Sequence, residues 1–588
     1  MSGLTGPKAA AGRLGRRRAV WRGGIVAGIV VLAAVLVPLA VAEIGETGPA
    51  AEPSHHLATL TGLTTRAPTA RARTRHPAPA PAPPQATVSI APGQSVTPVP
   101  SSFFGISTEY WALPLFERNT AAFERVLSLL HVAGDGPLIL RIGGDSADQS
   151  FYSQRWRPMP GWAFELTPAY LARLKALVLR DRVKLIVDLN LVTDTPLTAA
   201  LWARAAETAL PHGSIIGFEI GNEPDLYSRR HWVATIARSP LATGLLPLEL
   251  TPTTYVQDFA AYARVLGEGS PDIPLVGPAV AHPRISLPFI STLIGAQRSE
   301  LGMVTGHLYP YSACIKKPKS PSYPTVARIL SRQATSAFDT DIAGAVATAR
   351  SAGLPFRLTE FNSVTCGGKA GVSDTFATAL WAPDALFTAM RTGASGANLH
   401  VRASAINAAF TVTRGGLVPR PLLYGLLMFI RTLGPHAQLV RLHLSAARSL
   451  DLSAWGVQVR GRVLHVLLID KGSRTVRVDI RVPATATATV QRLLAPSPYS
   501  RSGVTLNGQQ LNYAGDWTGT ARDETLAPGS RGGYEVTVPR RSAALMIVPL
   551  ASPRHATTHR RAASEHHRRI AVAKHPVLAV SLDRPRKR

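Results

Sequence analysis

Cysteine is scarce in this chain, with two residues among 588. Two thiols cannot build a disulfide-rich scaffold, and Cys314 and Cys366 lack the close spacing of metal-ligand pairs. We therefore expect neither a metal site nor another cofactor.

Acidic residues are also few. Against 36 Asp and Glu stand 64 Lys and Arg, which gives a formal charge of +28. Such an excess could indicate a nucleic-acid binder, but much of it lies in two terminal segments, residues 13–22 and 554–588. A basic tail is solvated independently of the fold between the tails. We therefore expect no nucleic-acid partner; salt-dependent DNA binding by a tail-truncated chain would restore that alternative.

An uncharged apolar run begins at Ile25 and ends at Ala42. A basic segment that includes Arg16, Arg17, Arg18 and Arg22 precedes it. This pattern is typical of an export signal, and the final Ala-Val-Ala is typical of a cleavage site. Because the run is about as long as the minimum membrane span, membrane attachment through it is the alternative. Both outcomes place the rest of the chain outside the cytoplasm, either secreted or anchored to the cell membrane.

Composition divides the chain into five segments. A stretch rich in Ala and Pro has almost no large apolar side chain, so it cannot bury a core and should be an extended linker. The end of the chain lacks apolar periodicity and should be a disordered basic tail. The predicted segments are an export signal or anchor (1–47), the linker (48–86), a first folded domain (87–412), a second domain (413–550) and the tail (551–588).

The first domain alternates short apolar segments with amphipathic ones, which is typical of βα units around a parallel sheet. Eight strands are predicted, at residues 103–110, 137–144, 183–191, 215–223, 274–281, 303–311, 355–362 and 393–401. Eight βα units predict an α/β fold of the (β/α)8 TIM-barrel type, with catalytic groups at the carboxyl ends of the strands. A doubly wound open sheet is the alternative, but no glycine-rich phosphate loop follows any predicted strand.

After Arg414 the pattern changes to apolar alternation around short turns, as in SAWGVQVRGRVLHVLLIDKG. Period-two strands joined by short turns predict an appended antiparallel β-sandwich domain. The segment ATVSIAP, before the barrel, has no helix after it and is a candidate to pair with this sandwich.

Two glutamates stand where predicted strands end. Glu223 follows the fourth strand in GFEIGNEPDLY, where Pro224 fixes the turn, and Glu360 closes the seventh in FRLTEFNSVTCGG. A lone glutamate there would usually be a solvated charge. Two at matching strand ends favour glycoside hydrolysis, in which two carboxyl groups flank the bond that is cleaved. A separation of about 5–5.5 Å gives retention of configuration.

Several segments resemble a known family: FFGISTEYW, LRIGGDSAD, GFEIGNEPDLY, GHLYPYSAC, LTEFNSVTCGG and RPLLYGLLMFIRTLGP. Together they span the chain from Phe103 to Pro435. They resemble the clan A retaining glycosidases and, within that clan, glycoside hydrolase family 79, the heparanase and β-glucuronidase family. The predicted sandwich resembles that family's C-terminal domain more loosely.

The resemblance implies that Glu223 is the general acid/base and Glu360 the nucleophile. It also implies that Asn222 binds the sugar 2-hydroxyl, and that Tyr309 or Tyr311 holds the nucleophile. The chemistry is consistent with these roles, because the acid must be protonated near neutral pH while the nucleophile stays ionised.

Further polar residues at strand ends could bind sugar hydroxyls: Glu109, Asp145 and Asp148. Asp145 could instead cap the following turn. Tyr110, Trp111 and Trp232 could stack on a sugar or simply pack.

The resemblance implies a carbohydrate substrate, first of all a β-linked glucuronide. In the family, backbone amides near the Cys366-Gly367-Gly368 loop and an aromatic residue bind the C6 carboxylate, but here Thr365 stands where Tyr is expected. Four cationic side chains could also bind that carboxylate, namely Arg402, Lys369, Lys316 and Lys317. A neutral β-glycoside is the alternative substrate. A non-catalytic carbohydrate-binding protein is disfavoured, because both carboxylates are retained.

The two cysteines follow neighbouring strands of the predicted barrel. Cys314 comes a few residues after the sixth strand and Cys366 a few after the seventh, so their loops should rise side by side. With export to an oxidising compartment, this predicts a disulfide between them. The alternative is two free thiols that pack as small apolar groups.

Overall fold

The computed structural model describes residues 83–90, 96–153, 161–229, 250–270, 272–484, 486–529 and 532–550. The predicted export signal, most of the linker, the basic tail and Trp232 lie outside these residues. Within the described ranges, no helix has both the length and the apolar character that a membrane crossing requires.

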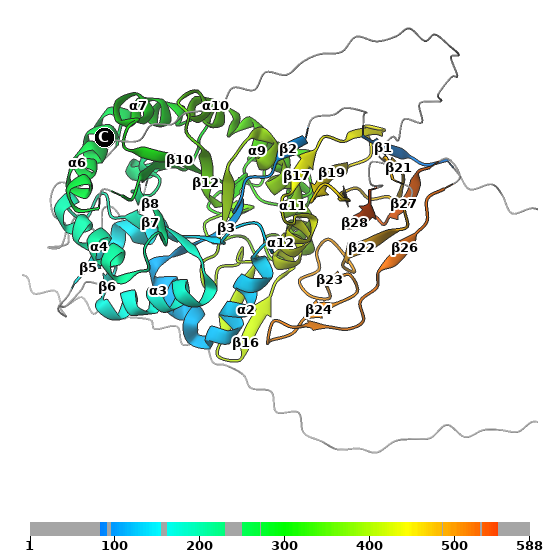
Figure 1. Ribbon diagram of the computed structural model, residues 1–588, viewed down its shortest axis with the longest axis horizontal. Coiled ribbons are helices and arrows are strands. Elements are labelled where there is room, and N and C mark those ends of the chain that lie inside the picture. Colours follow the sequence, from blue (N-terminus) through cyan, green and yellow to red (C-terminus); the bar gives the residue numbers. More distant parts are fainter. Residues whose placement is uncertain are drawn as a thin grey trace, which may run out of the picture. The chain divides into compact units, whose positions relative to one another are not determined.

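Eight parallel strands close into a barrel, as the sequence predicts (Figure 1). In barrel order they are β3 (Phe104–Glu109), β4 (Ile139–Gly143), β7 (Lys184–Leu189), β8 (Ile215–Ile220), β9 (Leu275–Val280), β10 (Leu301–Leu308), β12 (Phe356–Phe361) and β14 (Gly396–His400). Two predicted strands run too far: β8 ends three residues before Glu223, and β10 ends before Tyr311, which lies in a separate short strand.

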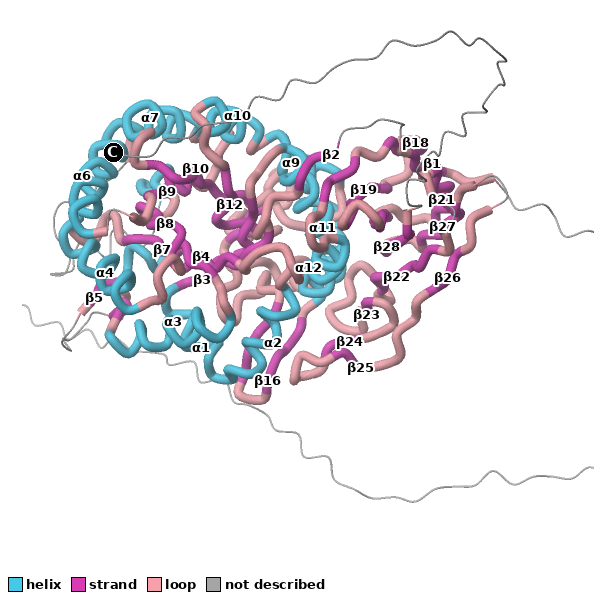
Figure 2. The backbone as a smooth tube through the Cα atoms, viewed as in Figure 1, coloured by secondary structure: helices cyan, strands magenta, loops and turns pink. Residues whose placement is uncertain are grey.

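Helices surround the barrel (Figure 2). The longer ones are α2 (Thr120–Leu130), α3 (Pro168–Asp181), α4 (Pro196–Ala209), α6 (Pro252–Gly269), α7 (Leu287–Gln297), α9 (Arg332–Thr340), α10 (Ala343–Ser351), α11 (Phe376–Thr392) and α12 (Pro421–Thr432). Helices α3, α4 and α6 all begin with a Thr-Pro pair. The threonine side chain accepts a hydrogen bond from a backbone N–H of the first turn, and proline fixes the first helical residue. Local sequence therefore sets where these helices start.

The second domain consists of two sheets that share a core. The larger contains β2 (Val96–Pro98), β17 (Gln438–Val440), β19 (Leu452–Val459), β20 (Val463–Asp470), β28 (Ser542–Pro549), β22 (Ala488–Leu494), β23 (Thr505–Leu506) and β26 (Glu524–Leu526). The smaller contains β18 (His443–Ala446), β1 (Ala86–Ser89), β21 (Val476–Arg481) and β27 (Tyr534–Val538). The predicted sandwich architecture is confirmed, except that one pair, β1 with β21, is parallel.

Strand β1 belongs to the second domain although it precedes the barrel in the chain. It pairs with β21, and Ala86 lies opposite Val478. Strand β2 pairs likewise with β17. The barrel is therefore inserted between strands of the second domain.

Helix α11 forms the seam between the domains. Every residue from Phe376 to Met390 is buried, which explains the almost continuous apolar sequence of this helix. Its one buried acid, Asp384, accepts hydrogen bonds from three groups of the second domain, the Nζ of Lys471 (2.7 Å), the Nε1 of Trp455 (2.8 Å) and the Oγ of Ser453 (2.9 Å). The predicted catalytic domain thus packs firmly against the sheets that follow it.

Candidate active site

Glu223 stands on a tight turn at the carboxyl end of β8. Gly221 and Glu223 both have left-handed backbones, with φ of 78° and 51°, a conformation that non-glycine residues seldom adopt. The N–H of Glu223 donates to the carbonyl of Ala279, next to the neighbouring strand's end (3.1 Å). Pro224 then begins a short 3-10 helix (Pro224–Arg229). The turn therefore holds the Glu223 carboxyl group at the catalytic end of the barrel.

Glu360 lies near the end of β12, and both of its carboxylate oxygens are engaged. Its Oε1 accepts from the Nη1 of Arg141 on β4 at 2.6 Å, and its Oε2 accepts from the hydroxyl of Tyr309 at 2.8 Å. Burial alone would raise the pKa of Glu360. The net shift is strongly downward, because His400, His307 and Arg141 place positive charge beside it and Tyr309 donates a hydrogen bond. The carboxylate is therefore held ionised.

Arg141 is the centre of a buried ionic cluster. Besides Glu360, its guanidinium donates to Glu219 on β8 at 2.7 Å and to Asp188 on β7 at 2.8 Å. Its Nη2 also donates to the side-chain oxygen of Asn222 (3.1 Å). Burial raises the pKa of Asp188 well above its usual value, against the opposing effect of Arg141. Because a guanidinium holds its N–H donors in a rigid plane, it orients several side chains at once.

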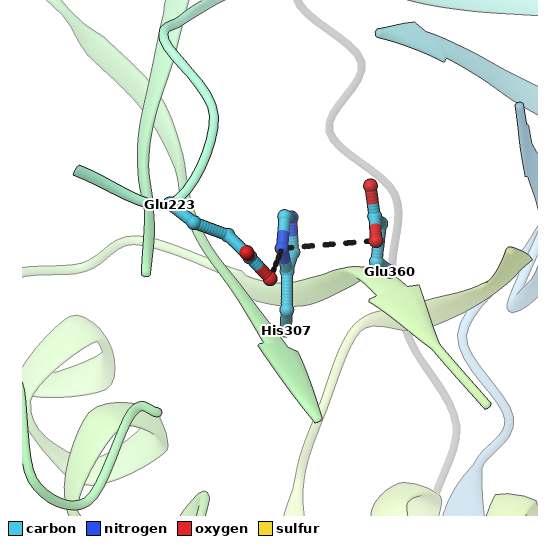
Figure 3. A group of neighbouring side chains, drawn as sticks. All are labelled: Glu223, His307 and Glu360. Atoms are coloured by element: carbon cyan, nitrogen blue, oxygen red, sulfur yellow. Dashed lines mark hydrogen bonds and ion pairs between the residues drawn. The ribbon is translucent and has the colours of Figure 1, made fainter. Parts of the chain in front are cut away.

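His307, on β10, lies between the two candidate catalytic glutamates (Figure 3). Its Nδ1 is 3.0 Å from an oxygen of Glu223 and 4.0 Å from one of Glu360. One ligand-type atom from each of these three residues lies within 4.8 Å of the others. An oxygen of Glu223 and an oxygen of Glu360 therefore lie within 4.8 Å of each other.

Among the described residues, these three also form the group whose side chains could bind a metal ion. Both oxygens of Glu360 are already bound, however, by the Arg141 guanidinium and by the Tyr309 hydroxyl. A cation placed there would be repelled by the buried guanidinium and would have to displace these donors. The arrangement suits an ionised nucleophile better than a metal centre.

Two further predicted residues lie at this end of the barrel. Asn222 is oriented by Arg141, which leaves its amide nitrogen facing Asp145 at 3.5 Å. Glu109, at the end of β3, is buried and accepts from the backbone N–H of Ser146 at 2.9 Å. Both side chains therefore have fixed positions beside the two candidate catalytic glutamates.

Two other predicted residues are buried and bonded to other parts of the chain. The carboxylate of Asp148 is buried, accepts from the N–H of Leu191 (2.9 Å) and is bonded by the hydroxyl of Tyr227. Tyr311 donates to the carbonyl of Arg328 at 2.9 Å. Of the two tyrosines that the sequence left open, Tyr309 contacts Glu360. Asp148 and Tyr311 instead hold neighbouring segments in place.

The predicted aromatic and cationic residues differ in their surroundings. Tyr110 is buried against Tyr170 and Trp202, so it packs rather than stacks on a sugar. The guanidinium of Arg402 lies over the ring of half-buried Trp111 and is 3.5 Å from a Glu109 oxygen.

The lysine candidates are bound to loops. Lys369 donates to the carbonyl of Pro324 and lies over Tyr323, while Lys316 donates to the carbonyl of Ala313. Lys317 is exposed. Gly367 accepts from the N–H groups of Ile406 and Asn407, so it ties two loops of this face together. Arg402 is the candidate that remains beside the carboxylates.

The predicted disulfide is confirmed. Cys314 and Cys366 are bonded, with their Cα atoms 5.9 Å apart. The loops that carry them also pair as short parallel strands, β11 (Tyr311–Ser312) and β13 (Val364–Thr365). The loop after β12, the strand that carries Glu360, is therefore fastened to the neighbouring loop.

Five residues of the site were not predicted: Arg141, Asp188, Glu219, His307 and His400. Each is a charged or titratable side chain within an otherwise apolar strand, as in LRIGG and GFEIG. That pattern was a usable signal, because such a group is seldom buried without a partner.

Comparison with known proteins gives related folds. A 4-O-α-L-rhamnosyl-β-D-glucuronidase from Fusarium oxysporum 12S is similar in structure, with a TM-score of 0.64 and 17% identity over 78% of this chain and 99% of that one. An α-L-arabinofuranosidase from Thermotoga maritima has a TM-score of 0.55 and 16% identity over 79% of this chain and 100% of that one. A family 44 xyloglucanase from Paenibacillus polymyxa has a TM-score of 0.54 and 10% identity over 79% of this chain and 100% of that one.

The sequence comparisons concern the second domain. No curated protein matches the chain. Residues 454–545 match the glycosyl hydrolase family 79 C-terminal beta domain. This match, beside a barrel of the fold found in those glycosidases, supports a glycosidase with a carbohydrate substrate and confirms the resemblance to glycoside hydrolase family 79.

Proposed function

We propose that this protein is a retaining β-glycosidase that hydrolyses β-D-glucuronides or glucuronic-acid-containing glycans by double displacement. The observation that carries the proposal is the pair Glu223 and Glu360, which lie after the fourth and on the seventh strand with oxygens within 4.8 Å of each other. Glu360 is clamped by a guanidinium and a tyrosine, which keep its carboxylate ionised and aimed as a nucleophile requires.

In the first step Glu360 attacks the anomeric carbon, while Glu223 protonates the departing glycosidic oxygen. In the second step Glu223 removes a proton from water, which attacks the same carbon and releases Glu360. Arg141 and Tyr309 aim the nucleophile and keep it charged. Asn222, fixed by Arg141, presents its amide nitrogen beside the catalytic pair, where the 2-hydroxyl of the sugar would lie.

A uronic acid as substrate is supported by Arg402, a guanidinium at the catalytic end of the barrel. It is also supported by the structurally similar Fusarium protein, which is described as a glucuronidase. A neutral sugar is the second candidate, because the buried Glu109 already neutralises Arg402 and would repel a sugar carboxylate.

A screen of aryl β-glycosides tests both candidates, with the glucuronide beside the glucoside, xyloside and galactoside. We expect kcat/KM for the glucuronide to exceed that for the glucoside by about 100-fold, or about 3 kcal/mol, the scale of a hydrogen bond to a charged group. Arg402→Gln should reduce this preference, whereas Lys317→Gln should not. A glucoside hydrolysed as well as the glucuronide would remove the uronic-acid specificity and leave the glycosidase chemistry intact.

We also propose that the enzyme acts outside the cytoplasm. The Cys314–Cys366 disulfide supports this location, because such bonds persist in oxidising compartments. N-terminal sequencing of protein recovered from the culture medium would test both export and signal cleavage, and protein found only in the cytoplasm would contradict the proposal.

A further inference from the structure

His400 ends the eighth barrel strand, β14, between two carboxylates. Its Nδ1 lies 3.5 Å from an oxygen of Glu360 and 3.2 Å from the hydroxyl of Ser107. Its Nε2 lies 3.7 Å from an oxygen of Glu109 on β3. The imidazole is buried, with 6% of its surface exposed. It therefore bridges the candidate nucleophile and a second acid.

Glu109 is held as a fixed anion. Its carboxylate accepts from the N–H of Ser146 at 2.9 Å and lies 3.5 Å from the Nε of Arg402. Burial by itself would raise the pKa of Glu109, but the net shift is downward because His400 and Arg402 stabilise the charge. An ionised Glu109 in turn favours a charged imidazole at His400.

All neighbouring strands contribute to the charge on His400. Burial would lower the pKa of His400, but Glu360 on β12 and Glu109 on β3 raise it further than burial and Arg402 lower it. Arg141, on β4, donates to the same Glu360 oxygen that faces His400 and lies 3.5 Å from the Ser107 hydroxyl, so His400 and Arg141 stabilise that oxygen together. An imidazolium flanked by two carboxylates is therefore the favoured state.

We propose that His400 and Glu109 form a positioning pair for the nucleophile: Glu109 keeps the imidazole charged, and the charged imidazole stabilises the Glu360 carboxylate. The inference rests on the proposed retaining mechanism. Its main effect falls on the second step, in which the bond between Glu360 and the anomeric carbon breaks and the electron pair returns to the Glu360 carboxylate. A neighbouring cation makes that carboxylate a better leaving group, and no proton has to move on His400.

The test is the pH-dependent kinetics of His400→Gln on an activated aryl glycoside of the preferred sugar. We expect kcat to fall about 10-fold or more, which corresponds to at least about 1.4 kcal/mol. KM should fall with it, so that kcat/KM at neutral pH changes much less. The glycosyl-enzyme should accumulate and be visible by intact-protein mass spectrometry. The acid limb of kcat/KM should move to higher pH, because the ionised Glu360 is less stabilised.

Glu109→Gln should act in the same direction through the loss of charge on His400, and it supplies the same readouts if His400→Gln does not fold. The matched control is His465→Gln, since His465 is a largely buried histidine of the second domain that bonds the carbonyl of Thr432. It should leave the pH limb, kcat and KM each unchanged.

Suppose that kcat and kcat/KM fall equally and the acid limb of kcat/KM stays at its wild-type pH. That result would overturn the proposed positioning pair and leave His400 with a packing role. Ring NMR signals of His400, assigned by their absence in His400→Gln, should stay those of an imidazolium at pH 7; a neutral ring there would also overturn it. A wild-type protein inactive on every aryl glycoside would overturn the proposed function and this inference together.

Discussion

Two buried ionic clusters lie in different regions of this protein, one at the catalytic end of the barrel and one at the domain seam. The seam cluster joins Asp384 to Lys471, Trp455 and Ser453, and both oxygens of its acid are bonded. It holds one anion and one cation. Charge and hydrogen bonding are thus balanced within the cluster, which suits a structural role.

The catalytic cluster is less completely bonded. Around the guanidinium of Arg141 lie three acids, Glu219, Asp188 and Glu360, and burial raises the pKa of Asp188 well above its usual value. Among the described residues, the Oδ1 of Asp188 and the Nε2 of His307 are buried without a hydrogen-bond partner. Such an arrangement lowers the stability of the fold but leaves these side chains available for chemistry. The comparison suggests that changes at the seam cost stability, whereas changes at the catalytic end cost rate.

The largest effect is expected from the catalytic pair. Glu360→Gln should abolish turnover of every substrate, because no other described group is placed to attack the anomeric carbon. Glu223→Gln should slow substrates with poor leaving groups by about 10²- to 10⁴-fold and spare activated phenolates, which need little acid assistance. Steady-state rates on both classes of glycoside check this, with circular dichroism as the control for folding.

Azide sharpens the assignment of Glu223. In Glu223→Gln it should restore turnover of the activated substrate and give a β-glycosyl azide, since azide needs no general base. If Glu223→Gln lost both substrate classes equally and completely, Glu223 would not be the acid/base.

A smaller effect, on stability alone, is expected at the seam. Lys471→Met removes the cation beside Asp384, whose pKa is depressed in the wild type because Lys471 and two hydrogen bonds from Trp455 and Ser453 outweigh burial. The free energy of unfolding should fall by about 3–5 kcal/mol at pH 7. Because burial then raises the pKa of Asp384, the deficit should shrink as the pH falls and the acid is protonated.

Urea unfolding at several pH values measures this effect. The matched control is Lys471→Met combined with Asp384→Asn, which leaves no buried charge and keeps an acceptor for Trp455; it should recover part of the loss at pH 7. A Lys471→Met variant as stable as wild type would show that the seam does not depend on its ion pair.

The smallest effect is expected at Asp470, a buried acid that ends β20. Its Oδ1 accepts from the N–H of Gly472, but its Oδ2 is buried without a hydrogen-bond partner among the described residues. Burial raises the pKa of Asp470 to about 6. A raised pKa in the folded state means that stability is greatest below the unfolded pKa of about 4 and is lost as the pH rises through 6.

Asp470→Asn should therefore stabilise the fold by about 1–2 kcal/mol at pH 7.5 and change little at pH 4, because the protonated acid is already neutral there. Chemical denaturation at the two pH values decides this. Glu535→Gln, at an exposed position of β27, is the control and should show no such difference. Equal effects of Asp470→Asn at both pH values would contradict a titrating group.

The fold was largely predictable because its signals are local. Each barrel strand is a short apolar run between turn residues, and helices such as α3 begin at Thr-Pro pairs. The positions of Glu223 and Glu360 follow from counting those strands. The disulfide was predictable for the same reason, since consecutive strands of such a barrel are neighbours in space.

The ionic cluster was not predictable in the same way, because it joins residues far apart in the chain. Arg141 lies 219 residues from Glu360 and 47 from Asp188, and no spacing rule relates them. Only the side-chain positions show that Tyr309, and not Tyr311, reaches the nucleophile. Likewise Asp148 resembles a ligand in sequence, but burial and two bonds make it structural.

The insertion of the barrel between strands of one sheet has a consequence for synthesis on the ribosome. Strand β1 emerges before the barrel, and Gln85, beside it, bonds to Arg477, 392 residues later. At about 5–20 residues per second, the strand waits roughly 20–80 s for its partner. A strand of four residues (Ala86–Ser89) offers little unpaired edge during that time. Its shortness protects the nascent chain from mispairing until the last sheet is translated.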